Sequence, residues 1–388
     1  MPVIPAIASL TEEMTAIRRD LHAHPELGFE EIRTSGIVAD FLEGIGADEV
    51  HRGIGKTGVV GVIRGNRPGN RMIGLRADMD ALPMEEDSDL PFRSTVPGKF
   101  HGCGHDAHTA MLMGAARYLA QTRDFAGTVV LIFQPAEEGL GGARAMLGDG
   151  LFDRFPCDEI YGMHNAAGFV PNSVVIKPGK AMAGSDFFDI TIQGRGSHGA
   201  MPELSRDPIV AGTHLVQAIQ SIVSRNVPAL KSAVVSVTKF NGGSAYNVVP
   251  DKVTMGGTIR FFDDAVGELV SQRLRDLAAG LERMFEVTVN VDIRNVFTVL
   301  ENDVELADEY ARAAADIVGE DLVSEAEVPL MGSEDFADML RARPGVYCMV
   351  GHTGGTPAHT PGFRVDETLL PVGASLYARI AERRLAAA

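Results

Sequence analysis

Hydrophobic residues in the first part of the chain alternate between helical periodicity and short uninterrupted runs. Segments 11–26 and 34–46 repeat apolar residues at helical spacing, and the second ends at a glycine. Four later runs rich in Val, Ile and Leu, bounded by glycine, proline or polar residues, are typical of buried strands: 57–65, 71–83, 127–139 and 158–165. This alternation predicts an α/β domain, in which ligand sites gather at the carboxyl ends of the strands.

The pattern changes between residues 184 and 294. Alternating strand patterns and two long amphipathic helix patterns follow one another there in the order βαββαβ. This order is the ferredoxin-like supersecondary pattern. We therefore predict a small α+β domain over 184–294, inserted into a larger α/β domain made of residues 1–183 and 295–388.

Charge restricts the partners of the protein. Asp and Glu outnumber Lys and Arg by 52 to 35, and the formal net charge is −17 at pH 7. A charge of this sign repels nucleic-acid phosphates and anionic lipid headgroups. We therefore expect neither nucleic acid nor a membrane as a partner.

The cysteine content and the apolar segments indicate the cellular compartment of the protein. Three cysteines in 388 residues are too few for a disulfide scaffold. The first residues lack the basic start of a signal peptide, and no segment approaches the roughly 20 apolar residues of a spanning helix. These features predict a cytoplasmic protein.

The stretch HGCGHDAHTA, residues 101–110, concentrates donors that suit a borderline-soft ion such as zinc. Cys103 and His105 stand two positions apart between glycines, so a bent backbone can direct both at one point. A buried cysteine beside a hydrogen-bonded histidine explains the decapeptide in isolation equally well.

Other donors stand at the ends of predicted strands. Glu137 and Glu138 close the run 127–139, where one carboxylate can bind an ion while its neighbour faces the substrate and takes a proton. His164 ends the run 158–165, and His359 lies between prolines that stiffen a loop. A solvated acidic turn and ordinary structural histidines are the alternatives for each of these taken alone.

Taken together, these residues offer more donors than one tetrahedral ion uses. The set comprises Cys103, His105, Glu138, His164 and His359. It suffices for two ions sharing a bridging water, as in hydrolases whose ions acidify the water and polarise a carbonyl.

Motifs along nearly the whole chain resemble those of a known family. They are RRDLHAHPELGFEE, LRADMDALP, HGCGHDAHTAMLMGAA, LIFQPAEEGLGGARAML, GMHN, GRGSHGAMPE, NVVPDKVTMGGTIR, GSEDFA and HTPGFRVDE. The chain is similar to the di-metal aminoacylase and carboxypeptidase superfamily, in its branch of hippurate hydrolases and indole-3-acetyl-amino-acid hydrolases. The resemblance implies a di-zinc-peptidase-like catalytic domain, a mixed sheet flanked by helices, with an inserted ferredoxin-like domain for dimerisation or for covering the site.

The resemblance also implies residue roles. The five donors named above become metal ligands, and Glu137 becomes the general base and proton shuttle. His198 of GRGSHGAMPE reaches the active site of a partner subunit, in a homodimer formed through the inserted domain, and stabilises the oxyanion. Asn247 of NVVP and Arg260 of GTIR bind the substrate, where a guanidinium suits a carboxylate.

Two departures limit what the resemblance transfers. Where other branches have a His-x-Asp metal motif, this chain has Asp78-Met79-Asp80, so we expect Asp80 to orient a ligand rather than to bind metal. Relatives often follow the MHN histidine with an aromatic residue and a proline, whereas this chain has MHNAAGFVP. The second departure concerns the choice of substrate and leaves the reaction unchanged.

The expected activity is hydrolysis of an N-acyl-amino acid to a carboxylic acid and an amino acid, by metal-activated water with Glu137 as base. Two divalent ions per subunit are expected, zinc first, with manganese, cobalt or nickel as alternatives. Two other functions remain open: a carboxypeptidase or dipeptidase acting on short peptides, and a non-catalytic binding protein with a degenerate site. The acyl group, benzoyl, acetyl or indole-acetyl, is not determined by the residues.

Overall fold

The computed structural model describes residues 3–386 and divides them into two compact units. Unit 1 contains the residues up to Ala181, Glu301–Pro329 and those from Asp335 onward, and unit 2 contains Met182–Leu300 and Leu330–Glu334. The second boundary lies later than the expected 294/295 because strand β13 (Thr288–Phe297) continues past Arg294.

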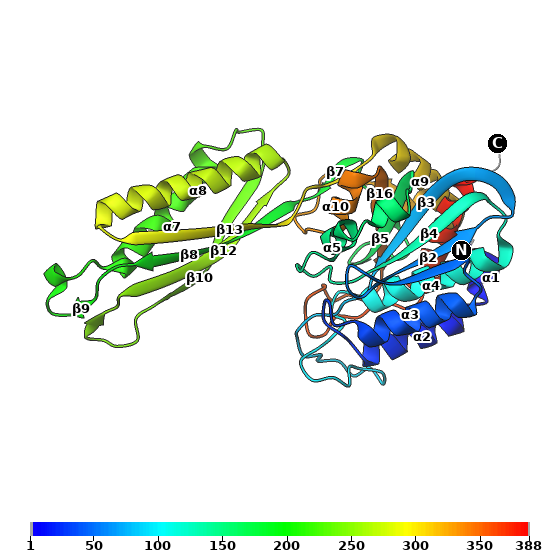
Figure 1. Cartoon of the computed structure of the whole chain (residues 1–388), viewed down its shortest axis with the longest axis horizontal. Helices are drawn as coiled ribbons and strands as arrows, with labels where there is room; N and C mark the ends of the chain where they lie inside the picture. The colour runs from blue at the N-terminus through cyan, green and yellow to red at the C-terminus, as the bar shows by residue number, and fades with distance from the viewer. Residues whose placement is uncertain (1–2, 387–388) are drawn as a thin grey trace. The chain divides into compact units, whose positions relative to one another are not determined.

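An eight-stranded mixed sheet forms the middle of unit 1 (Figure 1). Its strands lie in the order β1-β2-β4-β3-β5-β16-β6-β15. In chain order they are β1 (Glu49–Ile54), β2 (Gly58–Arg64), β3 (Arg67–Asp78), β4 (Ala126–Gln134), β5 (Glu159–Ala167), β6 (Val174–Ile176), β15 (Val323–Glu325) and β16 (Gly345–His352). Strands β4, β3, β5 and β16 run parallel, so their carboxyl ends meet at one edge.

The four apolar runs predicted as buried strands are confirmed as β2, β3, β4 and β5. Strand β16 was not anticipated, although it is almost wholly buried. The short strands β6 and β15 have only three residues each, too few for a periodic signal.

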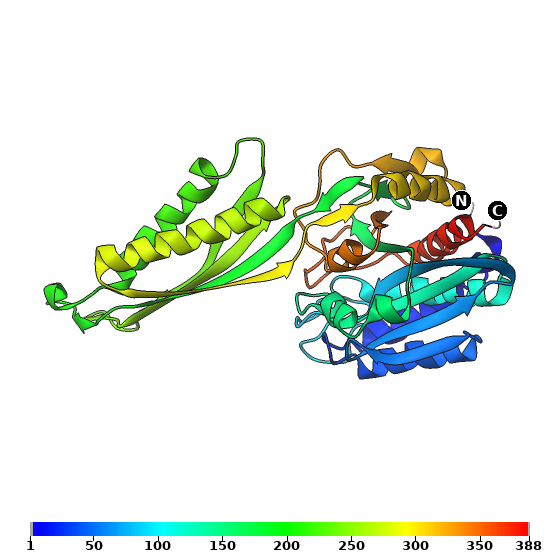
Figure 2. The ribbon, with the colours of Figure 1, turned by 45° about the horizontal axis from the view of Figure 1, so that its top comes forward.

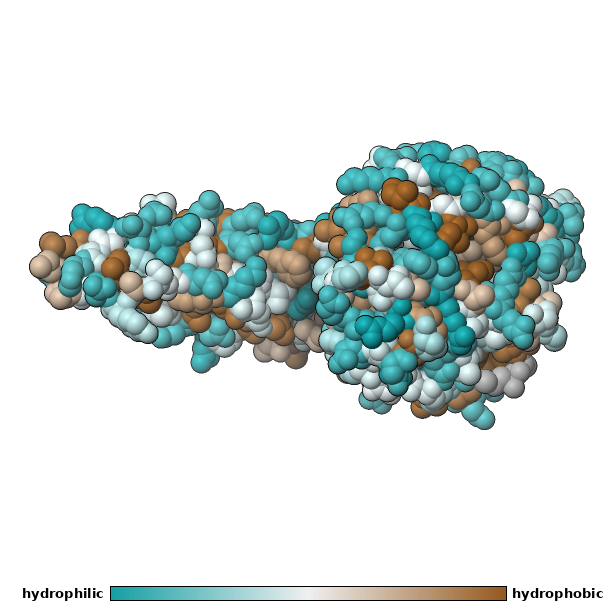
Figure 3. Space-filling view, turned by 90° about the horizontal axis from the view of Figure 1, so that it is seen from below, coloured by the Kyte–Doolittle hydropathy of each residue, from teal (hydrophilic) through white to brown (hydrophobic). Residues whose placement is uncertain are grey.

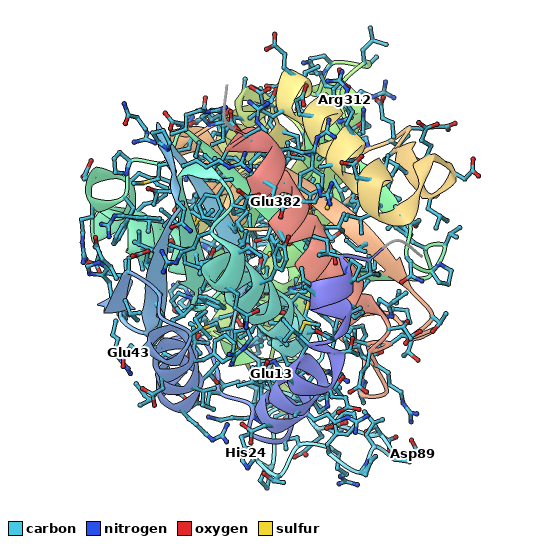
Figure 4. The ribbon with its side chains drawn as sticks, turned by 90° about the vertical axis from the view of Figure 1, so that its right-hand side faces the viewer. Glu13, His24, Glu43, Asp89, Arg312 and Glu382 are labelled. Carbon is cyan, nitrogen blue, oxygen red and sulfur yellow. The ribbon has the colours of Figure 1, made fainter. Side chains whose placement is uncertain are left out.

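Five helices lie on one side of this sheet: α2 (Thr11–Ala23), α3 (Ile32–Gly44), α4 (His105–Thr122), α9 (Val304–Val318) and α11 (Leu369–Arg384). Helix α4 is buried around most of its circumference because small and apolar residues occupy most of its positions. It packs between α2 and α11, and Figure 4 shows these helices beside one another, with Glu13 on α2, Glu43 on α3 and Glu382 on α11 labelled.

Neighbouring residues of β5 show that helices cover both faces of the sheet, since successive side chains of a strand point to opposite faces. The ring of Tyr161 stacks on Tyr310 of α9, with centroids 5.7 Å apart. Gly162 instead faces Phe336 of α10 (Phe336–Ala342). The other short helices of unit 1 are α1 (Pro5–Ala8), α5 (Gly142–Gly148), α6 (Leu151–Arg154) and η2 (Glu320–Leu322).

Unit 2 is a four-stranded antiparallel sheet with two helices on one face (Figures 1 and 2). Its elements are β8 (Gly184–Gln193), α7 (Pro208–Arg225), β10 (Ala233–Gly242), β12 (Lys252–Phe261), α8 (Asp264–Phe285) and β13. The strand order β10-β12-β8-β13 confirms the ferredoxin-like pattern. Strands β7 (Gly179–Met182) and β14 (Leu300–Asn302) lie where the chain passes between the units.

A small ladder extends one end of unit 2. It consists of β9 (Ser197–His198) and β11 (Val248–Val249), next to the short helix η1 (Pro202–Leu204). Within residues 3–386, no helix combines the length and the apolar character that a bilayer crossing requires. Figure 3 shows hydrophilic side chains over much of the visible face, in keeping with the acidic composition.

Candidate active site

The acidic and histidine residues of interest meet at one edge of the sheet in unit 1. Strands β4, β3 and β5 are neighbours and run parallel. Asp80 follows β3, Glu137 and Glu138 follow β4, and His164 projects from β5 three residues before its end at Ala167. The fold therefore collects side chains that are far apart in the sequence, as the carboxyl ends of parallel strands do.

A glycine bend supplies two further donors. Gly104 has φ +90° and directly precedes α4, which begins at His105. A Cβ atom at Gly104 would lie 2.4 Å from the Asn165 side-chain nitrogen, so the bend requires glycine for space as well as for conformation. The bend places Cys103 and His105 on either side of this glycine, facing the strand ends.

The five predicted metal ligands form two overlapping groups. The donor atoms of Cys103, His105 and His164 all lie within 4.8 Å of one another, and so do those of Cys103, Glu138 and His359. The Cys103 Sγ atom is 3.3 Å from His164 Nε2, and His359 Nε2 is 3.2 Å from Glu138 Oε1. Cys103 belongs to both groups, so its sulfur is the donor atom that they have in common.

Hydrogen bonds orient two of the imidazoles. His105 Nδ1 donates to Asp80 Oδ1 over 3.1 Å, and His164 Nδ1 donates to the carbonyl oxygen of Asn165 over 2.6 Å. Each bond directs the Nε2 atom toward the donor groups, which is how metal-binding histidines are usually held. Asp80 also accepts from the Glu138 backbone nitrogen over 3.0 Å, so one carboxylate ties two of the predicted ligands together.

The electrostatics of the cluster favour positive charge near Glu138 and neutral imidazole near β5. Hydrogen bonds to Cys103 and Glu138 raise the pKa of His359 to about 10. Burial lowers the pKa of His164 to about 3, so this ring is neutral and carries a lone pair on Nε2 at pH 7. A divalent cation matches both conditions.

The chemistry of the five donor residues fits a metal site. Within residues 3–386, His105 Nε2 is a buried nitrogen with no hydrogen-bond partner, and such atoms are costly unless something binds them. The donor set combines sulfur, imidazole nitrogen and carboxylate oxygen, which suits zinc and related divalent ions.

A buried polar network that contacts the donor residues was not identified from the sequence. Arg76 Nη1 donates to Asp78 Oδ2 over 2.8 Å, and His108 Nδ1 donates to Asp78 Oδ1 over 2.6 Å. The Asn165 backbone nitrogen donates to His108 Nε2, and its side-chain nitrogen donates to the Cys103 carbonyl oxygen. Arginine and aspartate near the buried end of an apolar strand are the sequence signal that could have indicated this network, because buried charges need partners.

Unit 2 carries the three residues assigned to substrate and oxyanion binding. His198 is exposed on β9, and the Asn247 carbonyl oxygen accepts from Gly199 next to it. Arg260 lies near the opposite end of the sheet, on β12, where Nη1 donates to Ser333 Oγ over 3.0 Å. At about 3.3 Å per residue of strand, His198 and Arg260 of one chain are separated by most of the length of β12.

The sequence model of Peptidase family M20/M25/M40 matches residues 74–383, which include all five predicted metal ligands. The chain belongs to this family. Hippurate hydrolase of Campylobacter jejuni subsp. jejuni serotype O:2 is 40% identical over 386 residues, covering 99% of this chain and 100% of the relative. IAA-amino acid hydrolase ILR1-like 4 of Arabidopsis thaliana is 40% identical over 383 residues, covering 96% and 86%.

A solved structure gives the same assignment. The YXEP protein of Bacillus subtilis, described as a dinuclear metal binding peptidase from the M20 family, is 33% identical and superposes with a TM-score of 0.82 over 97% of this chain and 99% of that chain. These matches confirm the family resemblance and the di-metal-peptidase fold class. The M20/M25/M40 member described here is a hydrolase that uses divalent metal.

Proposed function

We propose that the protein hydrolyses the amide bond of an N-acyl-amino acid, releasing a carboxylic acid and a free amino acid. Hippurate-like, N-acetyl and indole-acetyl conjugates are the proposed substrate class. The observation that carries the proposal is the placement of Glu137 beside the five donors, in a chain that matches a hippurate hydrolase along its full length.

Cys103, His105, Glu138, His164 and His359 would hold two divalent ions, zinc by preference, with manganese, cobalt or nickel as alternatives. Bound there, the ions would polarise the amide carbonyl and lower the pKa of water. Asp80 keeps the ligands in place through its bonds to His105 and to the Glu138 backbone.

Glu137 is the proposed base. Its side chain is only 8% exposed, and its Oε2 atom lies 4.0 Å from His105 Nε2, at the edge of the donor cluster. The Asp335 backbone nitrogen donates weakly to its Oε1 atom, at 3.4 Å. Glu137 would take a proton from the attacking water and deliver it to the leaving amine nitrogen, the two proton transfers that amide hydrolysis needs.

Arg260 and Asn247 are the proposed substrate-binding residues. Half-burial lowers the pKa of Arg260, and among the described residues no carboxylate lies within 4 Å of its guanidinium. An arginine with a hydroxyl partner and no counter-ion in an acidic chain suits a substrate carboxylate, which it can bind through two parallel hydrogen bonds. Asn247, on the loop before β11, lies next to His198 and, like it, far along the sheet from Arg260, so it would contact the substrate bound by a second subunit.

His198 is proposed to act in a second subunit of a homodimer. It is exposed in the single chain and lies far along the sheet from Arg260, so one chain does not bring the two residues together. Exposed apolar side chains on unit 2 supply material for an interface, among them Met201, Leu204, Val234, Phe240, Tyr246 and Val248. In Figure 3 hydrophobic side chains are visible at the surface of this unit. Across the dimer His198 would donate to the oxyanion.

The test is release of free amino acid from benzoyl, acetyl and indole-acetyl amino acids, with dipeptides alongside, using protein loaded separately with zinc, manganese and cobalt. Turnover of one acyl class that a chelator stops is expected. Turnover of dipeptides in place of acyl-amino acids would establish a peptidase. Absence of turnover with every metal would favour the alternative of a non-catalytic binding protein.

A further inference from the structure

The residue directly before Glu137 has an unusual backbone conformation. Ala136 has φ +55°, in the left-handed region that a residue with a Cβ atom rarely adopts, and it is completely buried. Such a conformation persists only where the surroundings impose it. Since φ and ψ of Ala136 set the direction in which the chain leaves β4, they also set where the Glu137 carboxylate points.

A buried carboxylate holds this residue. Glu31, completely buried, accepts a hydrogen bond from the Ala136 backbone nitrogen at Oε1 over 2.9 Å. Its Oε2 atom accepts from the Thr57 hydroxyl over 2.6 Å. Thr57 stands in the turn between β1 and β2, so the carboxylate links three segments: the start of α3, this turn and the end of β4.

Glu31 has no counter-ion. Within residues 3–386, no Lys, Arg or His nitrogen lies within 4 Å of its carboxylate. Burial, with a smaller contribution from the charge of Asp80, raises the pKa of Glu31 to about 7. A carboxyl group buried at this cost to stability is typical of a functional region.

Contacts on both sides of Glu137 restrain the same turn. Gly28 packs directly on Ala136, because a Cβ atom at Gly28 would lie 2.9 Å from both Cα and Cβ of Ala136. On the other side, the Glu138 backbone nitrogen donates to Asp80. The amide groups before and after Glu137 are therefore each held by a carboxylate, one from Glu31 and one from Asp80.

We propose that Glu31 is a positioning residue for the hydrolytic reaction: through its hydrogen bond to the Ala136 amide it holds the left-handed turn that aims Glu137 at the metal ligands. This inference rests on the proposed role of Glu137 as the base. Asp80 restrains the part of the turn that follows Glu137 and carries the proposed ligand Glu138. Glu31 restrains the part that precedes Glu137.

The experiment compares two substitutions of Glu31 in the metal-loaded enzyme. Glu31→Ala removes the acceptor, and we expect kcat to fall by about 100-fold, the scale of a 1 Å misplacement of a catalytic group, with metal content unchanged and KM within about threefold of the wild-type value. Glu31→Gln keeps an oxygen for the Ala136 amide and can donate to the Thr57 oxygen. It should retain kcat within about fivefold. Equal loss in both variants would overturn the proposal, because it would assign the effect to the charge.

Glu159→Ala is the matched control. Glu159 is also a buried carboxylate, and Tyr161 and Arg384 donate to it. It lies at the start of β5, at the amino-terminal ends of the parallel strands and so away from the candidate site. Loss of this carboxylate should lower stability and leave kcat near wild type. A Glu31→Ala enzyme with the kcat of the Glu159→Ala enzyme would overturn the proposal. If Glu31→Ala does not fold, Glu31→Asp tests the same point, since its shorter side chain cannot keep both hydrogen bonds.

A second substitution tests the backbone directly. Glycine adopts positive φ without a steric penalty, so Ala136→Gly should restore part of the lost kcat in the Glu31→Ala background, by about tenfold. No recovery would contradict a role through the Ala136 backbone. Glu137→Gln is measured in the same assay: if it keeps normal turnover, the proposed base is wrong, whereas an inactive Glu137→Gln with an active Glu31→Ala removes only the role of Glu31.

Discussion

The residues proposed to bind metal in unit 1 and the residues proposed to contact substrate in unit 2 are held in opposite ways. Cys103, His105 and His164 are buried or partly buried and have hydrogen-bond partners within their own unit. His198, by contrast, is exposed on a two-residue strand, and its Nδ1 atom accepts a hydrogen bond from the nearby Ala200 amide. The fold of one chain therefore brings the proposed ligands together, whereas the role proposed for His198 requires a second chain.

The same contrast applies to charge. In unit 1 Asp80 and the network around Asp78 hold the ligands at fixed positions before any substrate arrives, which is the preorganisation that catalysis by charge stabilisation requires. In unit 2 Arg260 has a hydroxyl partner and, among residues 3–386, no carboxylate within 4 Å, so its charge is available to a ligand. We infer that unit 1 provides the metal ligands and the base, whereas unit 2 provides substrate recognition and the oxyanion donor His198, and four experiments test this distinction.

The largest effect is expected for Glu137→Gln, which keeps the shape of the base and removes its ability to take a proton. General acid–base catalysis contributes about 10² to 10⁴ in rate, so kcat should fall by that factor while bound metal stays at the wild-type level. The adjacent Glu138→Gln is the matched control and should lose metal instead. A Glu137→Gln enzyme with kcat within about tenfold of the wild type would contradict the assignment.

Subunit mixing tests His198. His198→Ala should lower kcat by about 10² to 10³, as removal of an oxyanion donor does. Mixing His198→Ala protein with Glu137→Gln protein under conditions of subunit exchange should then restore about a quarter of the wild-type activity, because half of the dimers are mixed and each has one complete site. Activity that stays at the level of the two parents would show that His198 does not act across a dimer.

Arg260→Ala should weaken substrate binding more than it slows the reaction. Loss of a charged hydrogen bond costs about 1.5–3 kcal/mol, which is about 10- to 100-fold in kcat/KM and should appear mainly in KM. Arg273→Ala is the control on the same unit, since that arginine pairs with Asp276 on the surface of α8. An unchanged KM for Arg260→Ala with every acyl-amino acid would remove this residue from the recognition site.

The smallest effect concerns the pH dependence of stability in unit 1. Burial raises the pKa of Glu31 from its ordinary 4.5 to about 7. Because the folded-state pKa is above the unfolded value, the contribution of this group to stability is complete below about pH 4.5 and is lost as the pH rises through 7. The Glu31→Gln variant has no group that titrates at this position. Between about pH 4.5 and about pH 8 the wild type should therefore lose about 3 kcal/mol of unfolding free energy relative to the variant. Chemical denaturation at several pH values measures this, and a constant difference would contradict it.

Particular residues show how much of the fold and of the candidate site could be predicted from the sequence. The runs 71–83, 127–139 and 158–165 predicted strands with ligand sites at their carboxyl ends, and these strands lie together as β3, β4 and β5. The βαββαβ order of 184–294 predicted the fold of unit 2, which the sheet order confirms. Both succeeded because hydrophobic periodicity reports directly on local structure and on the buried face.

Other features had no local signal. His108 stands in the same decapeptide as Cys103, yet its bonds to Asp78 and Asn165 join segments more than 25 residues apart in the chain. Glu31 lies 105 positions from Ala136, and nothing in the sequence indicates that Ala136 adopts positive φ. Contacts of this kind depend on which strands become neighbours, which residue types alone do not specify.

Four features follow from the sequence alone: the α/β and ferredoxin-like elements, the acidic composition, the set of donor residues and, through its motifs, the family. Only the tertiary structure shows that Cys103 belongs to two donor groups and that the carboxylates of Glu31 and Asp80 accept from the amides on either side of Glu137. The physical reason is range: secondary structure follows from neighbours a few positions apart, whereas a metal centre is defined by distances of a few ångströms between residues more than 250 positions apart, such as Cys103 and His359.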